Sequence, residues 1–514
     1  MSTSGLTVSR QLLVGEIIKR AARRSPHTEA FIDDQQRVTY RQFEQRIMQM
    51  AGWLQQAGAG VGKNVGFILK NGLPFVEVFF GISLTKAAGV PINFRLTGEE
   101  IVYIVNNSDS HILFIEKEFA ETISSLRSKM PNVEHIVVVG SDTDIPGMIG
   151  YETIGQQTVV YQEAEQASDE EACMLVYTSG TTGRPKGAVL THKNISTNGM
   201  NMIWEFDYGF RQIQLVAAPL FHSAAMSMLI YAGMTMSTTI LHRDFNPVKV
   251  LQAIQTERVQ ILPMVPAMWN FLFQVPNLAE YDVSSLTHCI TGGAITPVEL
   301  KKRIMSTFPN AGIYDAFGQS EMSPATACLH PEDTLRKTTT VGRPVVNVEI
   351  RVVDEHGRDV GENEVGEIIY RGPTVMKEYY RDPQATAEAF SDGWFHSGDL
   401  VRVDEEGFIT IVDRKKDMII SGGENIYPAE IEEVLYRHPA VLEAAVIGVP
   451  DGEWGEKVRA CIVLKPGQAL TAEEVVAYCT ASLASYKKPK EIQFLDALPR
   501  NAGGKVLKRT LRDR

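Results

Sequence analysis

The residues best suited to chemistry lie in one segment, YTSGTTGRPKG, at positions 177–187, directly after the apolar run MLV. Two glycines allow backbone N–H groups to turn toward an anion, and several hydroxyls add hydrogen-bond donors. A lysine near the end of the segment supplies positive charge. The residues concerned are Thr178, Ser179, Gly180, Thr181, Thr182, Gly183 and Lys186. The segment therefore predicts a loop that holds a polyphosphate.

This loop is not the Walker type, because Pro185 precedes the lysine and Gly187 follows it. The Walker motif needs glycine before the lysine and serine or threonine after it. A solvated turn is the ordinary explanation for a short stretch rich in Ser, Thr and Gly. Eleven residues of this kind are nevertheless far more specific than a single GxGxxG.

Further motifs follow in a fixed order. They are TGGAITP (291–297), YDAFGQSEMSP (314–324), GWFHSGDL (393–400), DRKKD (413–417) and LPRNAGGKVLKR (498–509). With the phosphate loop, this series resembles the adenylate-forming superfamily, which includes acyl-CoA synthetases, peptide-synthetase adenylation domains and firefly luciferase. The resemblance covers the chain from about residue 30 to its end. It implies that the protein uses ATP and Mg²⁺, with coenzyme A as a co-substrate.

The resemblance implies a nucleotide site drawn from all these motifs. Phe317 would stack on the adenine, Ser320 would meet the α-phosphate, and Asp399 would bind both ribose hydroxyls beside Arg414. The ATP- and AMP-binding set it implies is Thr178, Ser179, Gly180, Thr181, Thr182, Gly183, Lys186, Gly292, Gly293, Ala294, Asp315, Ala316, Phe317, Gly318, Ser320, Asp399, Arg414 and Lys505.

The catalytic residues implied by the resemblance are Thr181, Lys186, Glu321, Lys416 and Lys505. Glu321 would hold Mg²⁺ together with Thr181, and Lys505 would bridge the substrate carboxylate and the α-phosphate. Because Lys505 then occupies the space that a thiol needs, the small domain must rotate about Lys416 before the second step.

The acyl site is expected around PLFHSAAM, where His222 follows Phe221. Amino-acid-activating relatives have an aspartate at this place, and a buried ammonium without a carboxylate would be costly. The acyl- and CoA-binding set is Phe221, His222, Met226, Gly293, Gly318, Gly422 and Gly423.

A medium- or long-chain fatty acid is the expected substrate, with aryl acids next. The flexible methionines that follow His222 suit the lining of an aliphatic pocket, but core filling explains them as well. His222 either guards the entrance of the pocket or is a satisfied buried histidine.

Two residues depart from the family pattern. Glu378, in MKEYY, replaces a common glycine, and Gly503 stands where serine or threonine often precedes the Gly-Lys pair. The second departure is expected to loosen the loop that carries Lys505.

The elements that must position these residues have α/β patterning. Helices alternate with short apolar strands, for example LTGEEIVYIV and then HILFIE, and Thr97 with Glu100 is spaced as a capping box. Alternating strands after about residue 345 indicate a β-rich subdomain. We expect an acyl-CoA synthetase-like α/β fold with an N-terminal AMP-binding domain (1–412), a hinge (413–416) and a small mobile α+β domain (417–514).

Composition narrows the class further. The formal charge is −12, which disfavours a nucleic-acid partner. Five scattered cysteines indicate neither a disulfide framework nor a zinc site. The uncharged run 212–242 is long enough for a membrane helix, but its Pro, His, Gly, Ser and Thr content favours strand, loop and buried helix. With no signal peptide readable, a cytoplasmic enzyme is expected; whether it forms a homodimer is left open.

Other functions fit part of this pattern. A stand-alone adenylation enzyme that loads a carrier protein would share nearly every residue named. A luciferase-like oxygenase has no separate feature in its favour. A catalytically inactive binding module would have no reason to keep Lys186, Glu321, Asp399 and Lys505 together.

Overall fold

The computed structural model describes residues 11–141, 145–157, 159–163, 168–178, 184–422, 424–500 and 506–512. The chain divides into two compact units, and each is described by itself. Unit 1 comprises residues 1–349 and 370–395, and unit 2 comprises residues 350–369 and 396–514. This division does not test the predicted hinge at 413–416.

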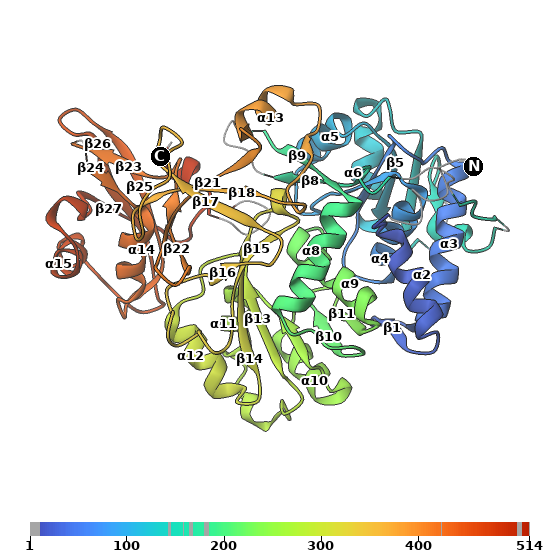
Figure 1. Cartoon of the computed structure of the whole chain (residues 1–514), viewed down its shortest axis with the longest axis horizontal. Helices are drawn as coiled ribbons and strands as arrows, with labels where there is room; N and C mark the ends of the chain where they lie inside the picture. Colours follow the sequence, from blue (N-terminus) through green and yellow to red (C-terminus); the bar gives the residue numbers. More distant parts are fainter. Residues whose placement is uncertain are drawn as a thin grey trace. The chain divides into compact units, whose positions relative to one another are not determined.

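Unit 1 contains two large sheets (Figure 1). The nine-stranded sheet has, in order, β16 (Arg343–Pro344), β15 (Ala325–Leu329), β14 (Gly312–Gly318), β13 (His288–Gly292), β12 (Ile261–Pro263), β10 (Ile213–Val216), β11 (Thr238–Leu241), β1 (Glu29–Ile32) and β2 (Arg37–Thr39). The eight-stranded sheet has β19 (Glu378–Tyr379), β9 (Lys186–Thr191), β8 (Ala172–Thr178), β4 (Ala88–Pro91), β3 (Asn64–Ile68), β5 (Ser110–Glu116), β6 (His135–Val139) and β7 (Ile149–Gly150). Most neighbours are parallel, as α/β patterning predicts.

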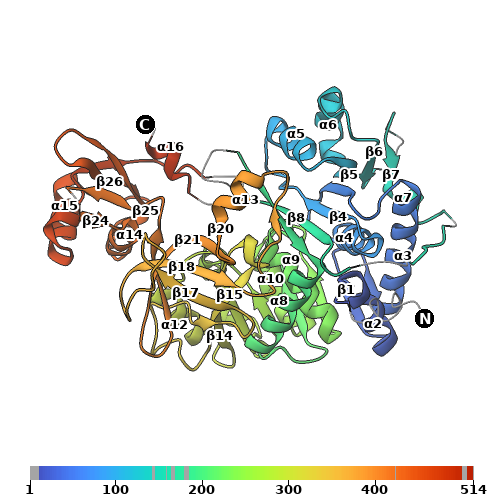
Figure 2. The same ribbon diagram turned by 45° about the horizontal axis from the view of Figure 1, so that its top comes forward.

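A group of helices packs together and against both sheets: α2 (Gly15–Arg24), α3 (Tyr40–Gln56), α4 (Leu73–Thr85), α8 (His192–Glu205) and α9 (Ser223–Thr235). Figure 2 shows α2, α3 and α4 close together at the N-terminal side of unit 1. Nearly every residue of α4 and α9 is buried. A helix that is apolar all round belongs in a core.

The remaining helices of unit 1 are α5 (Gly98–Asn107), α6 (Ala120–Leu126), α7 (Tyr151–Ile154), α10 (Pro247–Glu257), α11 (Pro266–Leu272), α12 (Val298–Thr307) and α13 (Pro383–Ala389). Thr97 and Glu100 form the predicted capping box of α5. The uncharged run 212–242 folds as β10, α9 and β11, which confirms the expected strand, loop and buried helix. In the part of the chain that is described, no helix has both the length and the apolar character needed to span a membrane.

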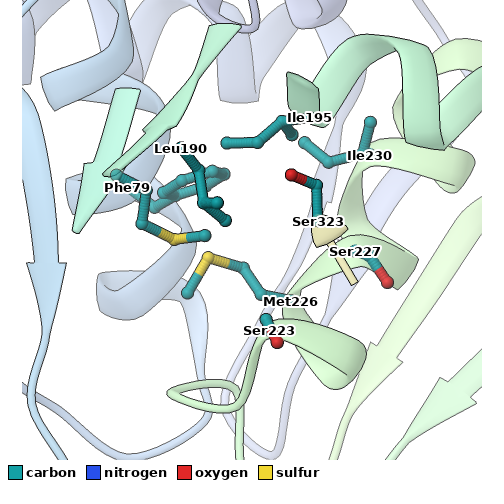
Figure 3. Close-up of a pocket in the computed structure, with 9 residues that line it drawn as sticks. Phe79, Leu190, Ile195, Ser223, Met226, Ser227, Ile230 and Ser323 are labelled. Atoms are coloured by element: carbon teal, nitrogen blue, oxygen red, sulfur yellow. The ribbon is translucent and has the colours of Figure 1, made fainter. Parts of the chain in front are cut away.

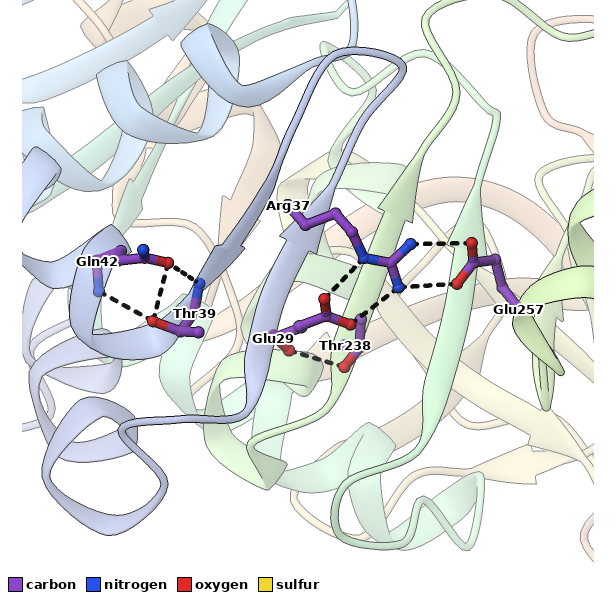
Figure 4. A network of polar contacts seen from close by, with 6 residues as sticks. All are labelled: Glu29, Arg37, Thr39, Gln42, Thr238 and Glu257. Atoms are coloured by element: carbon purple, nitrogen blue, oxygen red, sulfur yellow. Dashed lines mark hydrogen bonds and ion pairs between the residues drawn. The ribbon is translucent and has the colours of Figure 1, made fainter.

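The outer edge of the nine-stranded sheet carries a cluster of charged side chains (Figure 4). Arg37 on β2 donates to Glu29 on β1 at 2.7 and 3.0 Å and to Glu257 on α10 at 3.0 and 2.9 Å. We name Glu29, Arg37 and Glu257 the Arg37 cluster. Each carboxylate receives two N–H bonds from the guanidinium, so the cluster ties β2 to β1 and α10.

The predicted β-rich segment forms a five-stranded sheet in the order β17-β18-β21-β20, with β22 also paired to β21. Its strands are β17 (Glu349–Val353), β18 (Gly366–Arg371), β20 (Phe390–Ser391), β21 (Trp394–Val403) and β22 (Ile409–Arg414). The division between the two units falls within β17, β18 and β21.

The rest of unit 2 is the predicted α+β arrangement. Its second sheet has the order β24-β23-β26-β25, with β27 beside β26. The elements are β23 (Ile419–Ser421), β24 (Glu424–Ile426), α14 (Pro428–Tyr436), β25 (Val441–Asp451), β26 (Gly455–Leu464), α15 (Ala472–Ser482), β27 (Glu491–Phe494) and α16 (Lys508–Arg512). Thr471 and Glu474 form the capping box of α15. All five cysteines are free and buried.

Candidate active site

Strands β8 and β9 hold the two ends of the predicted phosphate loop. They pair antiparallel, and Thr178 is the register partner of Lys186. Residues 179–183, which include Ser179, Gly180, Thr181, Thr182 and Gly183, lie outside the described residues. The pairing sets Thr178 and Lys186 opposite each other where the chain leaves and re-enters the sheet, as a loop around an anion requires.

Glu321 reaches the same place from a different sheet. It lies in the short 3-10 helix η4 (Ser320–Met322), which follows β14 after one residue, and only 8% of its surface is exposed. The Thr178 hydroxyl donates to Glu321 Oε1 at 3.0 Å, and the Tyr379 hydroxyl donates to the same oxygen at 3.1 Å. The Lys186 ammonium lies 5.4 Å from the centroid of the Tyr379 ring. We name Thr178, Lys186, Glu321 and Tyr379 the Glu321 cluster.

The motifs TGGAITP and YDAFGQSEMSP begin on two strands that run side by side. β13 and β14 are parallel, and Gly292 pairs with Ala316. A Cβ on Gly292 would lie 2.4 Å from the carbonyl oxygen of Ala316, and one on Gly318 would lie 2.0 Å from that of Pro324. Strand packing alone therefore requires glycine at both positions, whether or not a nucleotide binds there.

The other predicted residues of these two motifs differ in how deeply they are buried. Phe317 is half-buried, and Gly293 and Ala294 are exposed beyond the end of β13. Asp315 is buried in an ion pair with Lys301 at 2.8 Å. A nucleotide contact from residue 315 would therefore come from its main chain.

The expected acyl residues lie at the start of α9 and in the loop before it. Phe221 meets the ring of Phe94 edge to face, with centroids 5.3 Å apart, and the ring of His222 at 4.3 Å. Burial, with a smaller contribution from the Arg95 guanidinium, lowers the pKa of the His222 imidazole to about 4. His222 is therefore neutral at pH 7.

Met226 lines a cavity of about 10 Å³ next to this region. Figure 3 shows Met226 at one side of the cavity with Ser223 beside it, and Ser223 Oγ lies 3.2 Å from Ser320 Oγ. A space of this size holds at most one water molecule. In this conformation Met226 fills the core, and a substrate would have to displace it.

The predicted ribose residues lie together in unit 2. Asp399 on β21 pairs in register with Arg414 on β22, and Arg414 Nε lies 2.6 Å from Asp399 Oδ1. The Asp399 N–H donates to Ser397 Oγ at 2.9 Å. This confirms that the two residues are neighbours, and leaves their contact with a ribose a prediction.

The remaining predicted residues of unit 2 lie near the hinge or outside the described residues. Lys416 is exposed in the turn after β22. Gly422 has φ +60° and donates its N–H to the Trp454 carbonyl at 2.8 Å. Gly423 and Lys505 lie outside the described residues, so their assigned roles stay predictions.

Tyr379 was not among the residues selected from the sequence. It is one of 16 tyrosines, and MKEYY attracts notice only through Glu378. Its role depends on the pairing of β19 with β9, which joins segments almost two hundred residues apart. The alternation of side chains along a strand would have indicated only that Tyr379 and Tyr380 face opposite ways.

Comparison with known protein families gives two matches. The model described as "AMP-binding enzyme" matches residues 18–380, and the model described as "AMP-binding enzyme C-terminal domain" matches residues 430–505.

Similar proteins and structures agree with these matches. The chain is 37% identical to a feruloyl-CoA synthase of an Amycolatopsis species, over 96% of this chain and 97% of that one. It is 35% identical to a long-chain-fatty-acid–CoA ligase of Mycobacterium tuberculosis, over 97% and 98%. Among solved structures, o-succinylbenzoate CoA synthetase from Bacillus subtilis, in complex with its acyl-adenylate intermediate, is 30% identical with a TM-score of 0.87, over 97% and 98%.

Proposed function

The chain belongs to the family of AMP-binding enzymes, and from this we propose that it is an acyl-CoA synthetase, which joins a carboxylic acid to AMP and then transfers the acyl group to coenzyme A. The observation that carries the proposal is the Glu321 cluster. A buried carboxylate meets Thr178 at one end of the phosphate loop, while Lys186 stands at the other end. The fold and the ordered motifs agree with this reaction.

In the first step, a carboxylate oxygen forms a bond to the α-phosphorus of ATP as the bond to pyrophosphate breaks. Two anions must approach, so positive charge has to be in place beforehand. Lys186 and the loop amides would hold the β- and γ-phosphates, and Lys505 would lie between the carboxylate and the α-phosphate. Asp399 would hold the ribose hydroxyls, with its charge balanced by Arg414.

Mg²⁺ fits the donor set at Glu321. The metal is commonly held by one or two carboxylates together with substrate phosphates. Both hydroxyl contacts of the Glu321 carboxylate fall on Oε1, and no hydrogen bond reaches Oε2 from the residues that the structure describes. Mg²⁺ bound there would neutralise phosphate charge. Thr181 is its second proposed ligand.

In the second step, the sulfur of coenzyme A forms a bond to the acyl carbon, AMP leaves, and the thiol proton passes to solvent. Lys505 must first withdraw, by rotation of the small domain about Lys416. Gly422 and Gly423 would line the passage for pantetheine. A carrier-protein thiol in place of coenzyme A is the nearest alternative acceptor.

The proposed substrate is a medium- or long-chain fatty acid. Phe221 and its partner Phe94 give the acyl region an apolar wall, and a neutral His222 offers no charge for a substrate ammonium. The alternative is an aryl acid, which the similarity to the feruloyl-CoA synthase favours. A cytoplasmic location stays a prediction.

Acid-dependent exchange between ATP and pyrophosphate tests the proposal. A panel of alkanoic acids of increasing length and of aryl acids would be assayed for exchange, and for AMP release with and without coenzyme A. Exchange with at least one acid, and faster AMP release when coenzyme A is present, is expected. Absence of exchange with every acid would overturn the proposal, and AMP release indifferent to coenzyme A would favour a carrier protein.

A matched pair of variants ties the activity to the site. Glu321→Gln should abolish exchange with the best acid. Glu378→Gln removes an exposed carboxylate on β19, next to Tyr379, and should leave exchange unchanged. Equal loss in both variants would mean that Glu321 has no particular role.

A further inference from the structure

We propose that Tyr379 is a positioning residue of the phosphate site, whose hydroxyl orients the Glu321 carboxylate and whose ring seats the Lys186 ammonium. The inference rests on the proposed function, because it assigns to Tyr379 the support of two groups that would bind Mg²⁺ and phosphate. It adds a residue that the motif series does not include.

The register of β19 and β9 explains the contact with Lys186. Tyr379 pairs with Ala188, and Lys186 lies two residues before Ala188 on β9. Residues two apart on a strand share a face, so Lys186 is a diagonal neighbour of Tyr379. The 5.4 Å between the ammonium and the ring centroid is within the range of a cation–π interaction. The ring thus keeps the ammonium at the mouth of the loop before ATP binds.

The contact with Glu321 is supported by the main chain as well. The Met376 N–H donates to the Glu321 carbonyl at 2.7 Å, and the Ser323 hydroxyl donates to the Thr374 carbonyl at 3.0 Å. The segment that carries Tyr379 therefore follows the turn η4 closely and holds it at three points.

The two hydroxyls on Glu321 act on one oxygen. Tyr379 and Thr178 both donate to Oε1, which fixes the plane of the carboxylate and directs Oε2 away from them. Outer partners of a metal ligand set its orientation, and their loss typically weakens metal binding by about 10–100-fold. Tyr379 should therefore affect how much Mg²⁺ the nucleotide needs.

Tyr380 provides the matched control. Its hydroxyl accepts from Asn64 Nδ2 at 3.1 Å, on the opposite face of the strand from Glu321. Tyr380→Phe removes one tyrosine hydroxyl from the residue next to Tyr379, just after the end of β19, without changing the Glu321 cluster.

The test is calorimetric binding of α,β-methylene ATP, which cannot be cleaved, across a Mg²⁺ series. Tyr379→Phe should raise the Mg²⁺ concentration for half-maximal binding about tenfold, with binding at saturating Mg²⁺ close to wild type. Tyr379→Leu also removes the ring, and should weaken binding about threefold even at saturating Mg²⁺. Thr178→Val, which removes the other hydroxyl, should shift the Mg²⁺ requirement in the same direction as Tyr379→Phe.

Two failures are distinguishable. In the first, wild type binds the analogue and neither Tyr379→Phe nor Tyr380→Phe changes the Mg²⁺ requirement. The role of Tyr379 is then overturned, and the proposed function stands. If wild type binds no nucleotide at any Mg²⁺ concentration, the proposed function itself fails. A changed Mg²⁺ requirement in Tyr380→Phe as large as that in Tyr379→Phe would also overturn the inference, because the effect would then be one of general structure.

Discussion

The Arg37 cluster and the Glu321 cluster differ in how their carboxylates are satisfied. Side chains of the Arg37 cluster are 30% to 46% exposed, and both carboxylates are taken up by one guanidinium. Glu321 is 8% exposed, and its described hydroxyl donors are neutral and fall on one oxygen. The first arrangement neutralises both carboxylates within the protein, whereas the hydroxyl partners of Glu321 leave its negative charge in place, as the proposed Mg²⁺ site requires.

The largest difference between the clusters should appear on replacing Glu321 by glutamine. We expect acid-dependent ATP–pyrophosphate exchange to fall by about 100-fold or more, because the amide lacks the charge that is proposed to hold Mg²⁺. The midpoint of urea unfolding should stay near the wild-type value. A large fall in that midpoint would mean that Glu321 mainly stabilises the fold.

Replacing Lys186 by methionine should have the next largest effect. Loss of one charged donor to a phosphate typically costs about 1.5–3 kcal/mol, or roughly 10–150-fold. The expected result is a rise in KM for ATP of this order in the exchange assay. Lys193→Met, at an exposed pair with Glu170, is the control and should leave KM unchanged. An unchanged KM in Lys186→Met would place the phosphates elsewhere.

Arg37→Ala should give the opposite pattern. Exposed ion pairs contribute at most about 1 kcal/mol, so urea unfolding should show a loss of that size. Exchange activity should be that of wild type, since the cluster ties β2 to its neighbours and contacts no predicted substrate. A loss of activity without a loss of stability would contradict the comparison.

The smallest effect concerns pH. Hydrogen bonds from Arg37 hold the pKa of Glu29 below its usual value of 4.5. The stabilisation is therefore present above pH 4.5 and is lost as the pH falls through the lowered pKa. The difference in unfolding midpoint between wild type and Arg37→Ala should be constant at neutral pH and should shrink below pH 4.5. If the difference instead grew on acidification, Arg37 would not be lowering the pKa of Glu29.

Local sequence predicted much of the fold. The capping boxes at Thr97 and Thr471 were readable because their partners lie three residues away. The run 212–242 was readable as strand, loop and helix because proline and polar residues interrupt its apolar character. The resemblance placed Thr178 and Glu321 in one nucleotide site, but it did not predict the hydrogen bond between them.

Long-range pairing explains what could not be predicted. Tyr379 reaches Glu321 and Lys186 only because β19 joins the edge of the eight-stranded sheet beside β9. Arg37 and Glu257 are 220 positions apart, and no local pattern links them. The burial of Asp315 against Lys301 likewise depends on how α12 packs on β14. Strand register and helix packing between distant segments depend on the whole fold, so local patterns in one sequence cannot predict them.

The central claim, that the acid is activated by direct bonding to AMP, is tested most directly with an acid labelled with oxygen-18 in its carboxyl group. Wild-type protein, ATP, coenzyme A and the labelled form of the best acid would be incubated, and the AMP would be analysed by mass spectrometry. The account predicts one labelled oxygen in each AMP formed, because a carboxylate oxygen stays on the phosphorus when the thiol attacks. AMP formed together with acyl-CoA but without label would contradict it.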